Sequence, residues 1–244
     1  MEFLHELQTA AFWVGLWQIV LVNIVLSGDN AVVIALAARS LPAHQQKQAI
    51  VWGAGAAVVL RIVLTIIALE MLKLPWLKLV GAALLLWIAV KLLVPEGDGG
   101  DDVKSSSNML SAIKTILIAD LVMSLDNVIG VAAAAKGSII LLVIGLALSI
   151  PLVVFGATIL MRLMQRFPII IVIGAGLLGW VAGEMAATDP IVHSWVEAHA
   201  AWLHWAAPAA GAIFVVAVGK FLARAKGDPE KVVDLGEGNA RPPH

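Results

Sequence analysis

The chain has 244 residues, of which 61% are hydrophobic and only 14% are charged, and its formal net charge at pH 7 is −1. Charged residues make up roughly a quarter of a soluble domain, so this composition indicates a membrane protein whose partner is the lipid bilayer and not nucleic acid. The chain contains no cysteine, which excludes disulfides and thiolate metal sites.

Seven apolar segments are long enough to cross the roughly 30 Å hydrocarbon core of a bilayer as helices. They cover residues 12–37, 49–72, 76–94, 110–134, 138–161, 168–187 and 206–224. The sequence therefore predicts an all-α membrane protein with seven transmembrane helices.

The two halves of the chain repeat each other. Residues 24–30, Ile-Val-Leu-Ser-Gly-Asp-Asn, align without gaps on residues 121–127, Leu-Val-Met-Ser-Leu-Asp-Asn, and Asn23 falls on Asp120. Because each repeat has an odd number of helices, the second would enter the membrane from the opposite side, as in many secondary transporters. We expect two inverted three-helix repeats plus a C-terminal helix. The predicted units are residues 12–94 (first repeat), 95–109 (cytoplasmic linker), 110–187 (second repeat), 188–205 (periplasmic loop), 206–224 (seventh transmembrane helix) and 225–244 (disordered cytoplasmic tail).

Lysine and arginine are distributed unequally between the connections. If the N-terminus is outside, Lys73, Lys78 and Lys136 lie on the outer side, and the other basic residues of the connections lie on the cytoplasmic side. Cytoplasmic loops are enriched in Lys and Arg. This pattern predicts a multi-pass protein of the bacterial inner (plasma) membrane, with its N-terminus outside and its C-terminus in the cytoplasm.

Three aspartates lie within the predicted spans, namely Asp29, Asp120 and Asp126. An ionised Asp at a helix centre costs roughly 2.5–3.5 kcal/mol on insertion scales, so such a residue usually faces a cavity or a partner and has a function. A hydrogen bond between packed helices is the alternative explanation, and it is strongest for Asp120, whose repeat mate is the neutral Asn23. Arg61, near the middle of the second span, needs a carboxylate neighbour unless it extends to the membrane surface.

Polar residues of the two repeats follow the helical spacing i, i+4 and i+7, which places them on one face of each helix. They are Asn23, Ser27 and Asn30 in the first repeat and Asp120, Ser124 and Asn127 in the second. Gly28 would allow the first helix to open beside Asp29. Leu125 occupies the equivalent position, which leaves open whether the second helix is broken.

Carboxylate, amide and hydroxyl oxygens form a set of hard ligands that suits Mg²⁺, Ca²⁺ or Mn²⁺, and no His or Cys lies in a span to favour zinc or copper. The candidate metal ligands are Asp29, Asp126, Asp120, Asn30, Asn127, Asn23, Ser27 and Ser124. Arg61 is an auxiliary charge. The three aspartates and Arg61 sum to −2, which one divalent cation would neutralise, and no permanently bound cofactor is expected.

Outside the spans, the predicted loop carries His193, Glu197, His199 and His204. This group has two interpretations, a surface cluster that collects metal or the polar face of an interfacial helix that also bears tryptophans. The second interpretation is favoured by the sequence.

With Ser-Gly-Asp-Asn at 27–30 and Ser-Leu-Asp-Asn at 124–127, one motif in each half, the chain resembles the TerC family of integral membrane proteins, in particular its short bacterial YjbE-type branch. The resemblance covers about residues 12–225. It implies a place in the LysE-like exporter superfamily and efflux of manganese, with Mn²⁺ as the transported substrate. Carried over to this chain, the family's acidic metal-site residues are Asp29 and Asp126, with Asn30, Asn127 and Asp120 beside them.

Other classes of function fit less well. An intramembrane aspartyl protease also needs two aspartates in the membrane, but those families use a Tyr-Asp motif and this chain has no tyrosine. We therefore expect no enzymatic activity. A metallation or assembly partner for exported proteins, and an exporter of another cation (Ca²⁺) or of an amino acid, are alternatives. The coupling ion and a homo-oligomeric state stay open.

Overall fold

The computed structural model describes residues 10–26, 28–71, 76–94, 102–135 and 138–225, without some of the side chains in these ranges. These residues form helices and short connections, with no strand among them. The helices are α2 (Ala10–Leu26), α3 (Gly28–Ala38), α4 (Ala43–Met71), α5 (Leu77–Leu93), α6 (Asp102–Ala135), α7 (Ile139–Arg166), α8 (Ile169–Ala187), α9 (Pro190–His199) and α10 (Leu203–Ala225). The predicted all-α class is confirmed, and the described part of each predicted apolar segment is helical over most of its length.

Among the described residues, four helices are long and apolar enough to cross a membrane, namely Ala43–Ile66 of α4, α7, α8 and α10. A fifth span results if α2 and α3, which are bent by 51° at their junction, count as one broken span. α5 has 17 residues, at the short end of helices that can span a bilayer. The number of seven spans therefore stays a prediction.

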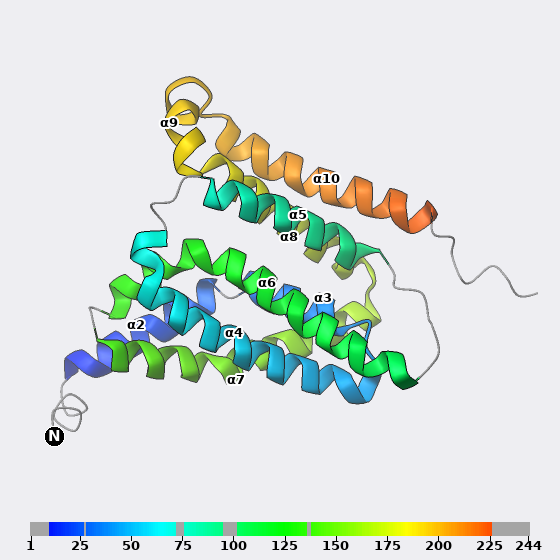
Figure 1. Cartoon of the computed structure of the whole chain (residues 1–244), viewed down its shortest axis with the longest axis horizontal. Helices are drawn as coiled ribbons and strands as arrows, with labels where there is room; N and C mark the ends of the chain where they lie inside the picture. The colour runs from blue at the N-terminus through cyan, green and yellow to red at the C-terminus, as the bar shows by residue number, and fades with distance from the viewer. Residues whose placement is uncertain (1–9, 27, 72–75, 95–101, 136–137, 226–244) are drawn as a thin grey trace, which may run out of the picture.

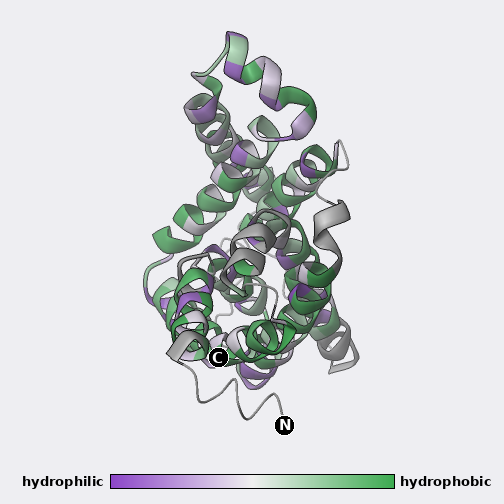
Figure 2. Cartoon of the chain, turned by 90° about the vertical axis from the view of Figure 1, so that its left-hand side faces the viewer, coloured by the Kyte–Doolittle hydropathy of each residue, from purple (hydrophilic) through white to green (hydrophobic). Residues whose placement is uncertain are grey.

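Large apolar side chains cover much of the outside of the molecule. Phe155, Ile213 and Phe221 are 67%, 69% and 71% exposed, and Figure 2 shows hydrophobic residues along most of the helices. A soluble monomer rarely exposes such extended apolar surface, whereas lipid tails solvate it well. This surface agrees with a multi-pass membrane protein.

The motif helix of the first half of the chain is divided into α2 and α3, whereas that of the second half, α6, is not divided. α2 ends at Leu26 and α3 begins at Gly28, while α6 runs continuously through Leu125. A side chain at Gly28 would meet no atom within 4 Å, so glycine is not required there for close packing. Its low helix propensity favours the break, whereas leucine at the equivalent position favours a continuous helix. The sequence left open whether the second motif helix is broken, and the structure shows that α6 is continuous at Leu125.

Helices also occupy part of the predicted connections. α6 begins at Asp102, within the segment 95–109 that the sequence predicts to be a linker. The glycines of this segment end at Gly100, and residues 102–109 contain neither Gly nor Pro, so the helix of the following span extends back through them. Similarly, α9 lies within the predicted loop 188–205.

Helices of one half pack on helices of the other. α2 and α3 contact α7, and α6 contacts α4, so the first helix of each half lies against the second helix of the other half. The third helices, α5 and α8, lie side by side, and α10 packs on both (Figure 1). This reciprocal packing agrees with an inverted repeat, which itself stays a prediction.

Small residues bring α8 and α10 into close contact. A Cβ atom added to Gly179 would overlap the carbonyl oxygen of Gly211, and one added to Gly183 would overlap that of Ala207. Small residues four positions apart let helix backbones approach closely in membranes. These residues therefore fix α10 on α8.

Replacing Gly183 by Ala should force α8 and α10 apart, because the added methyl group meets backbone atoms that cannot rotate away. We expect this overpacking to lower the free energy of unfolding by roughly 1–3 kcal/mol, measured as a lower melting temperature of the purified protein in detergent. Gly55→Ala is the matched control, since no atom lies within 4 Å of its Cβ position. Equal melting temperatures for the two variants would contradict the close contact.

Candidate functional site

Arg61 lies in the middle of α4 with its side chain buried in the bundle, and the residue is only 3% exposed. Its guanidinium donates hydrogen bonds from Nη2 to Asp120 Oδ1 (2.5 Å), from Nη1 to Asn23 Oδ1 (2.7 Å) and from Nε to Ser124 Oγ (3.0 Å). The acceptors come from two other helices, α2 and α6. Asp120 is thus the carboxylate neighbour that Arg61 needs, and Arg61 does not extend to the surface.

Asn23 and Asp120, which correspond in the sequence repeat, bind the same guanidinium from opposite halves of the chain. Both are buried, with exposures of 1% and 6%. Ser124, which accepts a hydrogen bond from Arg61, donates its own hydroxyl proton to Asp120 Oδ2 (3.2 Å). Both oxygens of the Asp120 carboxylate therefore accept hydrogen bonds, and the centre joins the two halves of the chain.

A buried ion pair is stable only when hydrogen bonds satisfy both charges, because desolvation costs several kcal/mol for each ion. The Arg61–Asp120 pair meets this requirement through Ser124 and Asn23. The hydroxyl of Thr65 also donates to the carbonyl oxygen of Arg61 (2.7 Å), one turn back on α4. The guanidinium of Arg61 and both oxygens of the Asp120 carboxylate therefore have hydrogen-bond partners.

Asp29 stands beside this centre, in the first turn of α3 and directly after the helix break. Its Oδ1 accepts a hydrogen bond from the backbone N–H of Asn30 (2.8 Å), and its carboxylate lies within range of attraction by Arg61 and of repulsion by Asp120. The positive end of the α3 dipole further favours a carboxylate at this position. The helix break thus places a second carboxylate near the buried ion pair.

The structure brings together part of the set predicted from the sequence. Around Arg61 it gathers Asn23, Asp120 and Ser124, with Asp29 within electrostatic range and Asn30, 3% exposed, next to it. Asn127 is half-buried on α6. Ser27 and the side chain of Asp126 lie outside the described residues, so their places in the site stay predictions.

A polar cavity of about 300 Å³ lies at another point, between the end of α3, the end of α5 and the beginning of α6. Its lining includes Arg39 and Lys91, together with Asn108 and Ser111. Two cationic side chains repel a divalent cation. None of the described residues that line it is a carboxylate, whereas the centre around Arg61 contains Asp120, so that centre is the better candidate for a cation site.

Asp189 is a buried polar residue that the sequence reading missed. It is 0% exposed, and its carboxylate accepts backbone hydrogen bonds from Ile191 at the start of α9 (3.0 Å) and from Lys78 and Leu79 at the start of α5 (3.1 and 3.2 Å). One carboxylate therefore caps two helices. The sequence signal was Asp189-Pro190, an N-cap residue followed by proline at the first helical position.

Comparisons with known proteins agree with an integral membrane protein. The sequence profile of the family described as "Integral membrane protein TerC family" matches residues 8–227. A Bacillus subtilis (strain 168) protein, "Uncharacterized membrane protein YjbE", is 41% identical over 188 residues, covering 77% of this chain and 86% of the relative. "Uncharacterized membrane protein YceF" of the same organism is 26% identical over 185 residues, covering 72% of each chain. No solved structure matches.

Proposed function

The chain belongs to the TerC family of integral membrane proteins, and on this basis we propose that it exports a divalent metal cation, Mn²⁺, from the cytoplasm. The observation that carries the proposal is the buried centre in which Arg61 lies against Asp120, Ser124 and Asn23, with Asp29 beside it. Intramembrane ionisable groups of this kind mark ion pathways.

In the ion-free form, the guanidinium of Arg61 supplies the positive charge that the buried oxygens require. A divalent cation carries two positive charges, so it attracts the same oxygens more strongly than Arg61 does. It therefore competes with Arg61 for Asp120 and also binds Asp29. The charges of the three aspartates, Asp126 included, and of Arg61 sum to −2, which one divalent cation neutralises. Arg61 therefore acts as an internal counter-ion that the metal replaces and that helps to release it.

The chemistry of the ligands supports a hard or borderline cation. The centre offers carboxylate, amide and hydroxyl oxygens from Asp29, Asp120, Asn23 and Ser124. Such ligands suit Mn²⁺, Ca²⁺ and Mg²⁺, and Mg²⁺ is disfavoured because it gives up its water reluctantly. Manganese as the physiological ion is inferred from the family resemblance.

The orientation of the protein in the membrane is inferred from the distribution of basic residues. In Figure 1 the end of α3, the end of α5, the beginning of α6 and the end of α10 all lie at the same end of the bundle. These are the elements that carry or adjoin Arg39, Lys91, Lys114 and Arg224. By the positive-inside rule we place this end in the cytoplasm and the α9 end outside. The two repeats would then expose the centre to each side in turn.

Transport by the purified protein in liposomes tests the proposal. With Mn²⁺ on one side and mass spectrometry of the vesicle contents, we expect protein-dependent Mn²⁺ movement that Ca²⁺ inhibits and that Zn²⁺ inhibits less, because a six-oxygen site penalises tetrahedral zinc. Protein-free liposomes give the background rate. Movement of an amino acid without any movement of Mn²⁺ would refute the proposal.

A further inference from the structure

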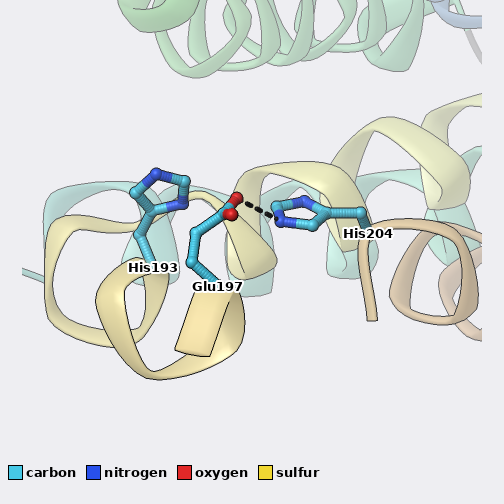
Figure 3. A group of neighbouring side chains, drawn as sticks. All are labelled: His193, Glu197 and His204. Atoms are coloured by element: carbon cyan, nitrogen blue, oxygen red, sulfur yellow. Dashed lines mark hydrogen bonds and ion pairs between the residues drawn. The ribbon is translucent and has the colours of Figure 1, made fainter. Parts of the chain in front are cut away.

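A separate group of side chains of the types that can bind metal ions lies where α9 leads into α10. His193 and Glu197 are one helical turn apart on α9, so they share a face of this helix. His204 comes from the first turn of α10 and points toward them (Figure 3). Two helices thus contribute three potential metal ligands to one place.

The geometry of this group is already close to that of a metal site. One ligand atom from each of the three residues lies within 4.8 Å of the others. Glu197 Oε1 and His204 Nε2 are 2.9 Å apart, and the rings of His193 and His204 are 6.1 Å apart, nearly perpendicular. In a tetrahedral zinc site with bonds of about 2.0 Å, ligand atoms lie about 3.3 Å apart. The side chain of His193 is exposed, so its rotation can bring its ring nitrogen closer to the other two ligand atoms.

Hydrogen bonds hold α9 in place at its first residues, and the side chains of the group are accessible from solution. Asp189 caps α9 and joins it to the beginning of α5, which fixes the helix that carries His193 and Glu197. The side chains of His204 and Glu197 are 31% and 56% exposed, so an ion can reach them from solution. Open access with a fixed backbone is what a three-ligand site with a free fourth position requires.

The ligand chemistry differs from that of the centre around Arg61. Two imidazoles and one carboxylate are the ligand set of zinc sites that keep an exchangeable position. Imidazole favours Zn²⁺, Ni²⁺, Co²⁺ and Cu²⁺ over Mn²⁺ and Mg²⁺. We infer that His193, Glu197 and His204 form a surface site for a borderline divalent transition-metal ion of the Zn²⁺ class, which links α9 to α10.

Metal binding to the intact protein tests this inference. The protein, purified through a tag without histidine and placed in lipid nanodiscs, is titrated with Zn²⁺ against a zinc-sensitive fluorescent chelator. We expect His193→Ala and His204→Ala each to weaken binding at this site at least tenfold, and Glu197→Gln to weaken it less. Co²⁺ in place of Zn²⁺ should give the strong visible absorption of a four-coordinate ion in the wild type and lose it in both histidine variants.

His199→Ala is the matched control. His199 lies on the same helix and is exposed, but its ring stacks on Trp195 (5.7 Å between centroids) and is not part of the group. This variant should keep the zinc affinity and the cobalt spectrum. The inference would be overturned if zinc binding were unchanged in His193→Ala and His204→Ala, or if His199→Ala weakened it equally. Neither result would affect the proposed transport function.

Discussion

Asp29→Asn is expected to reduce Mn²⁺ transport by on the order of 100-fold or more, with the protein still folded in the membrane. Unit charges about 4 Å apart interact by about 4 kcal/mol at an effective dielectric constant of about 20, and each 1.4 kcal/mol is a factor of ten in affinity. Asn keeps the shape of Asp and the Oδ1 atom that accepts the hydrogen bond from Asn30 (2.8 Å). The substitution therefore removes the charge and little else.

The liposome assay with Mn²⁺ measures this effect. Glu184→Gln is the matched control, because it removes one carboxylate charge from an exposed position at the end of α8 and should transport at the wild-type rate. Asp126 aligns with Asp29 in the sequence repeat, so Asp126→Asn should show the same loss of Mn²⁺ transport. A wild-type rate for Asp29→Asn would show that the ion does not pass this centre.

The helices and the centre could be predicted from the sequence to different degrees. The length of the apolar segments predicted where helices lie, and Gly28 indicated the break between α2 and α3. The alignment of Asn23 with Asp120 placed both residues on equivalent faces of the repeat. Because Arg61 is a charge in an apolar span, its need for a carboxylate could be inferred before the partner was known.

The choice among partners depends on tertiary packing and could not be read from spacing. Asp120 is 59 residues from Arg61 in the chain, and either of the other aspartates satisfied the same charge argument. Asp189 reaches the start of α5 from 111 residues away, and a predicted loop gave no reason to expect it to be buried. Likewise, His204 joins His193 and Glu197 only because α10 turns back at the end of α9.

Arg61→Ala is expected to destabilise the ion-free protein and to slow the transport cycle. Removal of one partner of a buried ion pair costs about 3–5 kcal/mol, because the other charge is left without compensation. The carboxylate of Asp120 and the oxygens of Asn23 and Ser124 would lose the donor that they share. A bound divalent cation would supply the missing charge, so Mn²⁺ should be held more tightly and released more slowly.

Melting temperatures with and without Mn²⁺, together with transport rates, separate this role from that of a purely structural ion pair. We expect Mn²⁺ to raise the melting temperature of Arg61→Ala by more than that of the wild type. Arg61→Lys keeps the charge but loses the planar fork that reaches three acceptors, so an intermediate shift is expected. The double variant Arg61→Met/Asp120→Asn removes both charges and should recover stability without recovering transport. If Mn²⁺ stabilised Arg61→Ala no more than the wild type, Arg61 would not be a stand-in for the ion, and the balance of charges proposed for the centre would have to be abandoned.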